Sequence, residues 1–223
     1  MRNIFLILLC TGAVTSLHAQ FNVGLQGSYM NNFTNENTGH FGFGIRGEVG
    51  LSQEFAIQGG VNYFFPSDYS HEFEAIAYVS TTTPNVIPIL GNSKLSYTNY
   101  YIGAKYYLKG SHSTFKKNSE TAVYIAGGVG VLAGGFETTA NLTNNISRDL
   151  YEVPVKDTQL GAFTYLTFNP SIGVEKLFGS IYLYSEFKAY LKVYEASRSG
   201  VDFPIPYVFN LNVGMRFGFG ADY

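Results

Sequence analysis

The chain has 223 residues, of which only 13% are charged and 17% aromatic, and its formal net charge is −2. Soluble domains usually carry about twice that share of charged residues, roughly a quarter. The near-neutral balance also gives no electrostatic reason to expect a nucleic-acid partner.

The first 19 residues are predicted to be an export signal that is cleaved after Ala19. Arg2 supplies the positive start, and the apolar run from Ile4 to Leu9 is too short for a permanent membrane helix, which needs about 20 residues. Cys10 lies inside this run after Leu9, where a lipoprotein signal has a small residue, so lipidation is not favoured. The predicted domain then covers residues 20–223 and has no cysteine, which excludes disulfides and thiolate metal sites.

Beyond the signal, no segment offers about 18 uninterrupted apolar residues for a membrane helix. The dominant pattern is instead an alternation with period two, which is typical of strands that face lipid on one side and a lumen on the other. In residues 41–51 one face is oily, with Phe41, Phe43, Ile45, Val49 and Leu51. The other face is small or charged, with Gly42, Gly44, Arg46, Glu48 and Gly50. Residues 181–193 repeat the pattern, although alternation alone also fits a water-soluble sandwich.

Six further segments show similar alternation, at 21–30, 55–65, 95–108, 121–135, 160–175 and 207–219. Together they predict an all-β fold, an eight-stranded antiparallel up-and-down transmembrane β-barrel. Pro170 falls on the predicted lipid face of its segment and cannot donate to the ladder, so we expect a bulge or a weakened register there.

The predicted connections alternate in length, which favours a membrane barrel over a sandwich. Short ones lie near 52–54, 109–120 and 176–180, and long ones near 31–39, 66–94, 136–159 and 195–206. Outer-membrane barrels place short turns on the periplasmic side, so both termini are predicted to be periplasmic. The stretch 66–94 is long for a plain loop, and we expect strand three to continue above the membrane or a short protruding hairpin.

The last predicted strand carries Asn212, Gly214, Phe217 and Phe219 in the order polar, glycine, apolar, aromatic. This spacing resembles the signal that the barrel assembly machinery reads in the closing strand of a barrel. Gly214 is expected to let the strand pass a crowded lumen, while Phe217 and Phe219 point outward near the membrane interface.

As a whole, the region 20–223 resembles the small outer-membrane β-barrel families typified by OmpA, OmpX and OmpW. The Ala19-Gln20 junction and the strands rich in Tyr and Gly are also similar to the PorT-like barrels of Bacteroidota. The resemblance implies a Gram-negative outer-membrane location with membrane lipids as partners, but one fold serves many functions.

Seven charged residues fall on the predicted lumen face: Arg46, Glu48, Lys105, Glu175, Glu186, Lys188 and Arg216. Charges enclosed together should pair, since an isolated one costs several kcal/mol. We therefore expect a network of salt bridges and tyrosines that fills the barrel, because eight strands leave an interior just wide enough for side chains. A narrow ion or proton path remains the alternative.

The chain contains no convincing catalytic, cofactor or metal motif. Ser70, His71 and Glu72 combine suitable residue types, and His40 is predicted to close the first long loop, but adjacent residues of a strand point to opposite faces. The leading hypothesis is a non-enzymatic barrel that is a structural component or the membrane anchor of an envelope complex. The alternatives are an adhesin or ligand-binding protein acting through 66–94 and 136–159, a lipid-modifying enzyme and a narrow channel.

Overall fold

The computed structural model describes residues 21–32, 38–78, 85–110, 121–140, 150–152, 158–179, 181–199 and 207–219, which are almost entirely β-strand. The predicted signal and its cleavage point lie outside these residues. Among them, no helix is long and apolar enough to span a membrane.

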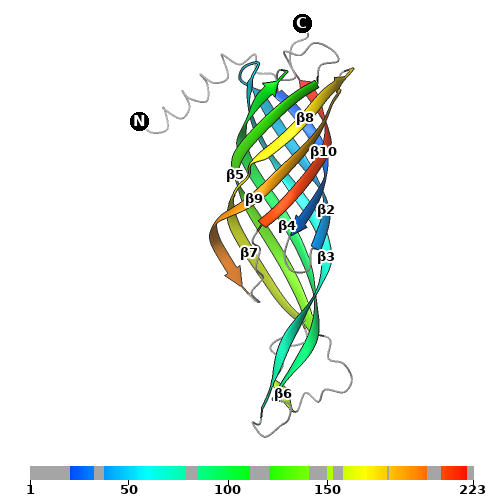
Figure 1. Ribbon diagram of the computed structural model, residues 1–223, viewed down its shortest axis with the longest axis vertical. Coiled ribbons are helices and arrows are strands. Elements are labelled where there is room, and N and C mark those ends of the chain that lie inside the picture. The colour runs from blue at the N-terminus through cyan, green and yellow to red at the C-terminus, as the bar shows by residue number, and fades with distance from the viewer. Residues whose placement is uncertain are drawn as a thin grey trace, which may run out of the picture.

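All strands belong to one antiparallel sheet that closes into a ring (Figure 1). They are β1 (Phe21–Asn32), β2 (Thr38–Gly50), β3 (Phe55–Ala77), β4 (Val86–Lys109), β5 (Thr121–Ala140), β6 (Tyr151–Glu152), β7 (Thr158–Phe168), β8 (Ser171–Phe178), β9 (Ile181–Ser199) and β10 (Tyr207–Phe219). The first and last strands pair along their whole length, from Phe21 opposite Phe219 to Asn32 opposite Val208. Because β7 and β8 share one position in the ring and β6 stands outside it, the ring has eight positions, as predicted.

Alternation along each strand separates an oily outside from a polar inside. In β2, the side chains of Phe41 and Ile45 are 71% and 54% exposed on the outer face, whereas Arg46 and Glu48 are each 1% exposed inside the ring. Successive side chains of a strand point to opposite faces. Once one residue of the strand faces inward, the face of every other residue is therefore set. The ring is thus apolar outside and carries its charges within.

The strand is interrupted at Asn169 and Pro170, between β7 and β8. The expected bulge is absent in the pairing with β5, because Phe168 lies opposite Val129 and Ser171 opposite Ala126, with two residues between them on each side. Pro170 has no N–H group to donate, yet its carbonyl accepts a hydrogen bond from the Ala189 N–H at 2.9 Å. The irregularity falls instead in the pairing of β7 with β9, where the register shifts twice between Thr164 and Thr167.

The stretch predicted as the long connection 66–94 consists mostly of strand. Beyond a register shift between Phe64 and Ser67, β3 and β4 stay paired up to Ile76 opposite Val86 and project well past the ring (Figure 1). Within the predicted connection 136–159, β5 continues to Ala140, and β6 pairs with the end of β3. We call Ser67–Tyr78, Asn85–Leu95 and Leu150–Glu152 the arm; it confirms the expectation that strand three continues beyond the ring.

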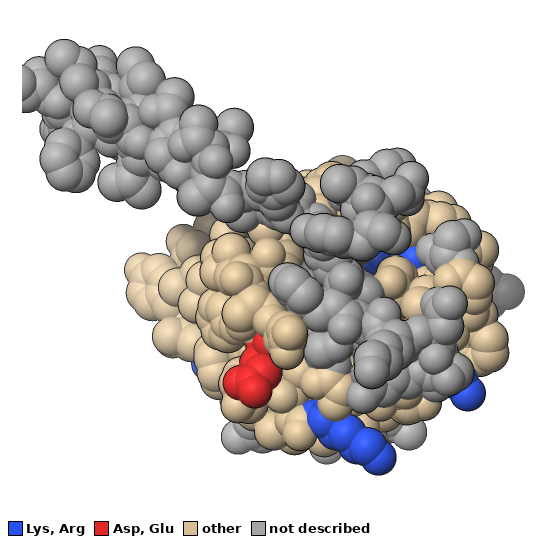
Figure 2. All heavy atoms as spheres, turned by 90° about the horizontal axis from the view of Figure 1, so that it is seen from above, with Lys and Arg blue, Asp and Glu red and all other residues tan. Residues whose placement is uncertain are grey.

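The end of the ring opposite the arm holds the start of β1, the end of β10 and the connections that were predicted to be short, including the turn at Gly179, whose φ is +61° (Figure 1). Seen from that end in Figure 2, most of the described surface is uncharged, with only a few charged groups in view. The predicted alternation of short and long connections is wrong for the observed strands. Eleven residues separate β4 from β5 at this end, whereas five separate β1 from β2 and seven separate β9 from β10 at the other, because the strands continue into the predicted loops.

Candidate functional site

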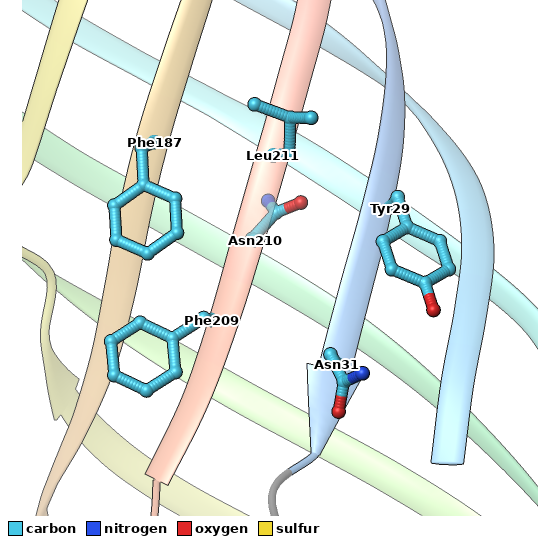
Figure 3. A pocket seen from close by; sticks show the side chains of 6 residues that line it. All are labelled: Tyr29, Asn31, Phe187, Phe209, Asn210 and Leu211. Atoms are coloured by element: carbon cyan, nitrogen blue, oxygen red, sulfur yellow. The ribbon is translucent and has the colours of Figure 1, made fainter. Parts of the chain in front are cut away.

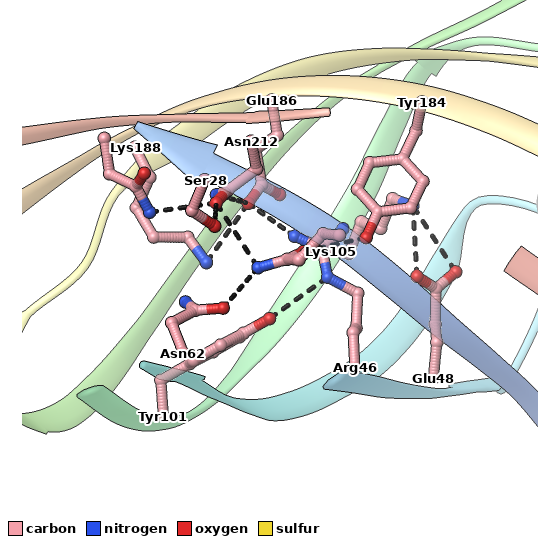
Figure 4. A network of polar contacts seen from close by, with 12 residues as sticks. Ser28, Arg46, Glu48, Asn62, Tyr101, Lys105, Tyr184, Glu186, Lys188 and Asn212 are labelled. Atoms are coloured by element: carbon pink, nitrogen blue, oxygen red, sulfur yellow. Dashed lines mark hydrogen bonds and ion pairs between the residues drawn. The ribbon is translucent and has the colours of Figure 1, made fainter. Parts of the chain in front are cut away.

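The seven charged residues that alternation assigned to the lumen all lie inside the ring. Each is at most 2% exposed, and they come from β2, β4, β8, β9 and β10, which surround one space. They form two groups of ion pairs, and Figure 4 shows Glu48 and Lys105 of one group and Arg46, Glu186 and Lys188 of the other.

The first group, here called the charge ring, consists of Glu48, Lys105, Glu175 and Arg216. The Lys105 ammonium lies 3.1 Å from Glu48 and 2.8 Å from Glu175, and the Arg216 guanidinium contacts both carboxylates, at 2.8 Å from Glu175. The Tyr107 hydroxyl lies within hydrogen-bonding distance of both glutamates, at 3.2 Å from Glu48 and 3.0 Å from Glu175. Each buried charge therefore has two partners of opposite sign, the condition under which buried ion pairs are tolerated.

The second group centres on Glu186, whose carboxylate pairs with Arg46 and with the Lys188 ammonium at 3.1 Å. Arg46 also donates from Nε to the Tyr101 hydroxyl at 3.0 Å, and the Lys188 ammonium lies 3.7 Å from the centre of the Tyr101 ring. The two groups hold four cations and three carboxylates, so one positive charge is in excess. The faces of the tyrosine rings carry the negative part of the ring quadrupole, so they offset part of the excess positive charge.

Uncharged polar side chains lie beside the second group. The Tyr184 hydroxyl donates to Gln26 at 2.7 Å, Ser28 donates to the Asn212 amide oxygen at 2.6 Å, and Asn212 in turn donates to Glu186 at 3.4 Å. Asn212, predicted as part of an assembly signal, is thus also a buried member of the lumen network.

The other three residues of the predicted assembly signal lie on β10, where Gly214 faces inward. A Cβ atom there would lie 2.6 Å from the Tyr184 hydroxyl, so only glycine leaves room for that ring. Phe217 follows the outward parity of the strand and is partly exposed, and the side chain of Phe219 lies outside the described part of the chain.

At the end toward the arm, the lumen is closed by an apolar cluster that we call the plug. Its members are Met30, Phe64, Leu95, Tyr97, Leu132, Phe136, Phe163, Tyr165, Tyr190 and Val208. Phe163 packs edge-on against Tyr97 with ring centres 5.6 Å apart. Side chains therefore fill the lumen at both ends, by ion pairs at one and by apolar contacts at the other.

The residues considered for hydrolytic chemistry are not brought together. His40 is 1% exposed and packs on Tyr97 at the plug, not in a loop at the rim as expected, because β2 begins at Thr38. Its Nδ1 atom lies 3.4 Å from the Phe65 carbonyl on β3, and Ser70 lies five residues farther along that strand, about 16 Å at the strand rise. Ser70 donates to Asn92 at 2.9 Å, and the side chains of His71 and Glu72 are outside the described part.

No group of three or more His, Cys, Asp or Glu side chains in the described residues is arranged to hold a metal ion. A shallow hollow of about 390 Å³ opens on the outer face of the ring, between β1, β10 and β9 (Figure 3). Tyr29, Phe187, Phe209 and Leu211 form its apolar walls, and no charged group lines it. Its chemistry suits contact with hydrocarbon, not catalysis.

The sequence did not predict the plug or the contacts of the uncharged polar side chains beside Glu186. Met30 and Phe64 share the inner parity of Gln26 and Asn62, so alternation placed all four on one face. A change of pattern along each strand could have predicted the plug. Toward one end of the strand, apolar residues occupy the inward positions as well as the outward ones, so the two faces no longer differ in polarity.

No family model matches the chain, and no curated protein matches it. Among solved structures, Neisserial surface protein A is similar with a TM-score of 0.52 at 10% identity, covering 89% of this chain and 97% of that one. A major outer membrane protein from Thermus thermophilus is similar with a TM-score of 0.50 at 11% identity, covering 90% of this chain and 99% of that one. At such identities the likeness concerns the fold alone, and by that measure this chain has the architecture of the small outer-membrane β-barrel proteins.

Proposed function

We propose that this chain is an outer-membrane β-barrel protein that catalyses no reaction and serves as a structural component or membrane anchor of an envelope complex. Its ring holds the protein in the lipid, and its arm meets partners outside the bilayer.

The observation that carries the membrane assignment is the inverted distribution of side chains. Large apolar residues are exposed around the ring, such as Ile102 at 61%, while every charged residue of the charge ring is buried. In water this arrangement would expose apolar side chains to solvent and bury ions. In a bilayer, lipid tails cover the apolar outer face. A closed ring also pairs all backbone groups, which a membrane-spanning sheet requires.

The filled lumen supports an anchoring role over a channel. Packed apolar side chains of the plug fill one end, and the charge ring holds its ions in mutual contact at the other. We therefore expect no stable conductance, and the ring acts as a rigid support.

The proposed orientation places the termini in the periplasm and the arm outside the cell, because outer-membrane barrels carry their longer excursions of chain on the extracellular side. Asn212, Gly214, Phe217 and Phe219 would present the closing strand to the barrel assembly machinery after removal of residues 1–19. Kinship with the PorT-like barrels of Bacteroidota is part of the same proposal.

Fractionation and electrophoresis test the proposal directly. The full chain should appear in the outer-membrane fraction, migrate faster unboiled than boiled because the folded barrel resists detergent, and form no stable pores in planar bilayers. A chain that stays folded and soluble without detergent contradicts the membrane assignment, and stable open pores contradict the closed lumen.

A surface ligand-binding or adhesive role is the second candidate, and the arm is the observation that favours it. Three strands project beyond the ring and enclose a small core of Ala75, Ile89 and Tyr151, more structure than a plain connection needs. Replacing residues 68–93 with a tight turn should abolish binding of cells to host or neighbouring surfaces if this role holds. Unchanged adhesion, together with loss of an envelope complex, would favour the anchor.

A further inference from the structure

The far end of the arm has one covered face and one exposed apolar face. Ala75, Ile89 and Tyr151 form the covered core. On the other side, four apolar side chains are 45–61% exposed. We call them the tip face: Ile76, Tyr78, Val86 and Leu150.

The tip face is contiguous, because Ile76 pairs with Val86 across the hairpin and the Tyr78 N–H donates to the Leu150 carbonyl at 3.0 Å. It also lies at the end of the arm farthest from the ring (Figure 1). Between it and the ring, Asp68 and Lys94 are exposed on neighbouring strands, so this part of the arm is suited to water. An apolar patch beyond such a polar stretch marks an interaction surface, not a continuation of the lipid-facing belt.

The described residues around the tip face are acidic. Glu74 is exposed two residues before Ile76 on the same side of β3, and Glu152 lies opposite Ile76 on β6. Lys94 is the cation in the described part of the arm. It lies opposite Asp68, near the ring and far from the tip face. An apolar surface with an acidic border repels anionic lipid headgroups and favours a protein surface bordered by Lys and Arg.

A partner protein is expected to dock on the side chains of the tip face and not to add a strand to the edge of β3. Between Phe64 and Ile76, the outer edge of β3 pairs with no strand among the described residues. That edge carries Pro66 and exposed acids, features that discourage strand pairing.

We propose that the tip face docks an envelope protein whose apolar contact patch is bordered by Lys or Arg side chains. The proposal rests on the proposed function, since it needs the arm to project from the membrane. Apolar burial supplies the attraction, and the acidic border selects the partner.

Photo-crosslinking of the full chain in the cells that produce it tests this. A benzophenone amino acid replaces Tyr78, and the matched control carries it at Asn92, which is exposed on the arm but nearer the ring. We expect one protein adduct from Tyr78, none from Asn92, and a crosslinked partner peptide that contains Lys or Arg. Glu74→Lys with Glu152→Lys should lower the adduct at least about tenfold, while Glu137→Lys, an exposed charge reversal on β5, leaves it unchanged.

Each other outcome counts against the tip face. An adduct with a second copy of the chain, an adduct with lipopolysaccharide, insensitivity to the charge reversals, or no adduct overturns the proposal. Heat-modifiable migration and fractionation of the same samples distinguish failure of the tip-face proposal from failure of the proposed function. A folded chain in the outer membrane without the adduct overturns only the tip face, whereas a chain outside that membrane overturns the proposed function as well.

Discussion

The two halves of the lumen lie on the same inner face of the barrel but are filled by opposite chemistry. Toward the termini, Glu48, Lys105, Glu175 and Arg216 form the charge ring, and toward the arm, residues such as Leu132 and Phe163 form the plug. Both halves close the barrel. They differ in what a single substitution leaves behind, an unpaired ion in one case and a cavity in the other.

Forming a buried ion network yields little net stability, because desolvation of the ions offsets most of their attraction. Breaking it is costly, since the remaining partners stay buried without compensation. Close packing in the plug stabilises the folded barrel. A substitution there lowers that stability in proportion to the volume of the cavity that it leaves. The comparison therefore predicts different patterns of coupling in the two halves.

The largest effect is expected from Glu175→Gln, which removes the carboxylate shared by Lys105 and Arg216. Two buried cations then share Glu48, and the free energy of unfolding should fall by about 3–5 kcal/mol. Urea unfolding of the barrel in lipid vesicles, followed by electrophoretic mobility, measures it. Glu137→Gln, an exposed glutamate on β5, is the control and should change stability by less than about 0.5 kcal/mol.

A double substitution sharpens this result. Adding Lys105→Met to Glu175→Gln removes one cation along with the carboxylate and leaves Glu48 paired with Arg216. The double variant should be more stable than Glu175→Gln alone, because no unpaired cation remains. Additive losses would show that the charge ring is not a coupled unit.

In the plug, Leu132→Ala should lower stability by about 2–5 kcal/mol, because the buried side chain leaves a cavity among its neighbours. Leu183→Ala makes the same chemical change on the outer face, where the side chain is exposed and lipid or detergent fills the space. The same unfolding assay compares them. Equal losses at the two positions contradict the packed plug.

Gly214→Ala should cost about 1–3 kcal/mol, because the new methyl group meets the Tyr184 ring and the Leu25 carbonyl. Gly27→Ala, on the neighbouring strand with its nearest atom 3.9 Å away, serves as the matched control and should be tolerated. Slow assembly with unchanged stability would instead point to the closing-strand signal as the main role of Gly214.

The smallest effect is expected for Glu195→Gln on β9. Its ion pair with Lys192 at 2.7 Å is about one-third exposed, so solvent weakens it and the loss should be about 0.2–1 kcal/mol. Added salt should reduce the difference between variant and parent further. A loss as large as that of Glu175→Gln would erase the distinction between buried and exposed pairs.

The sequence alone determined which side chains of each strand share a face. Alternation from Phe41 to Glu48 and from Ile181 to Lys192 is a local property of the chain, and a period of two assigns Arg46 and Glu186 inward whatever their partners are. It also placed Pro170 on the outer face, where its missing N–H breaks the ladder without shifting the register with β5.

Only the tertiary structure decided which inward residues meet. Glu48 contacts Arg216 and Lys105, and Glu175 contacts the same two cations, because strand tilt and register bring β2, β4, β8 and β10 to one level of the lumen. The same is true of the tip face, which exists because β6 returns to pair with β3. Alternation is fixed by neighbours along the chain, whereas these contacts depend on how distant strands are staggered around the ring.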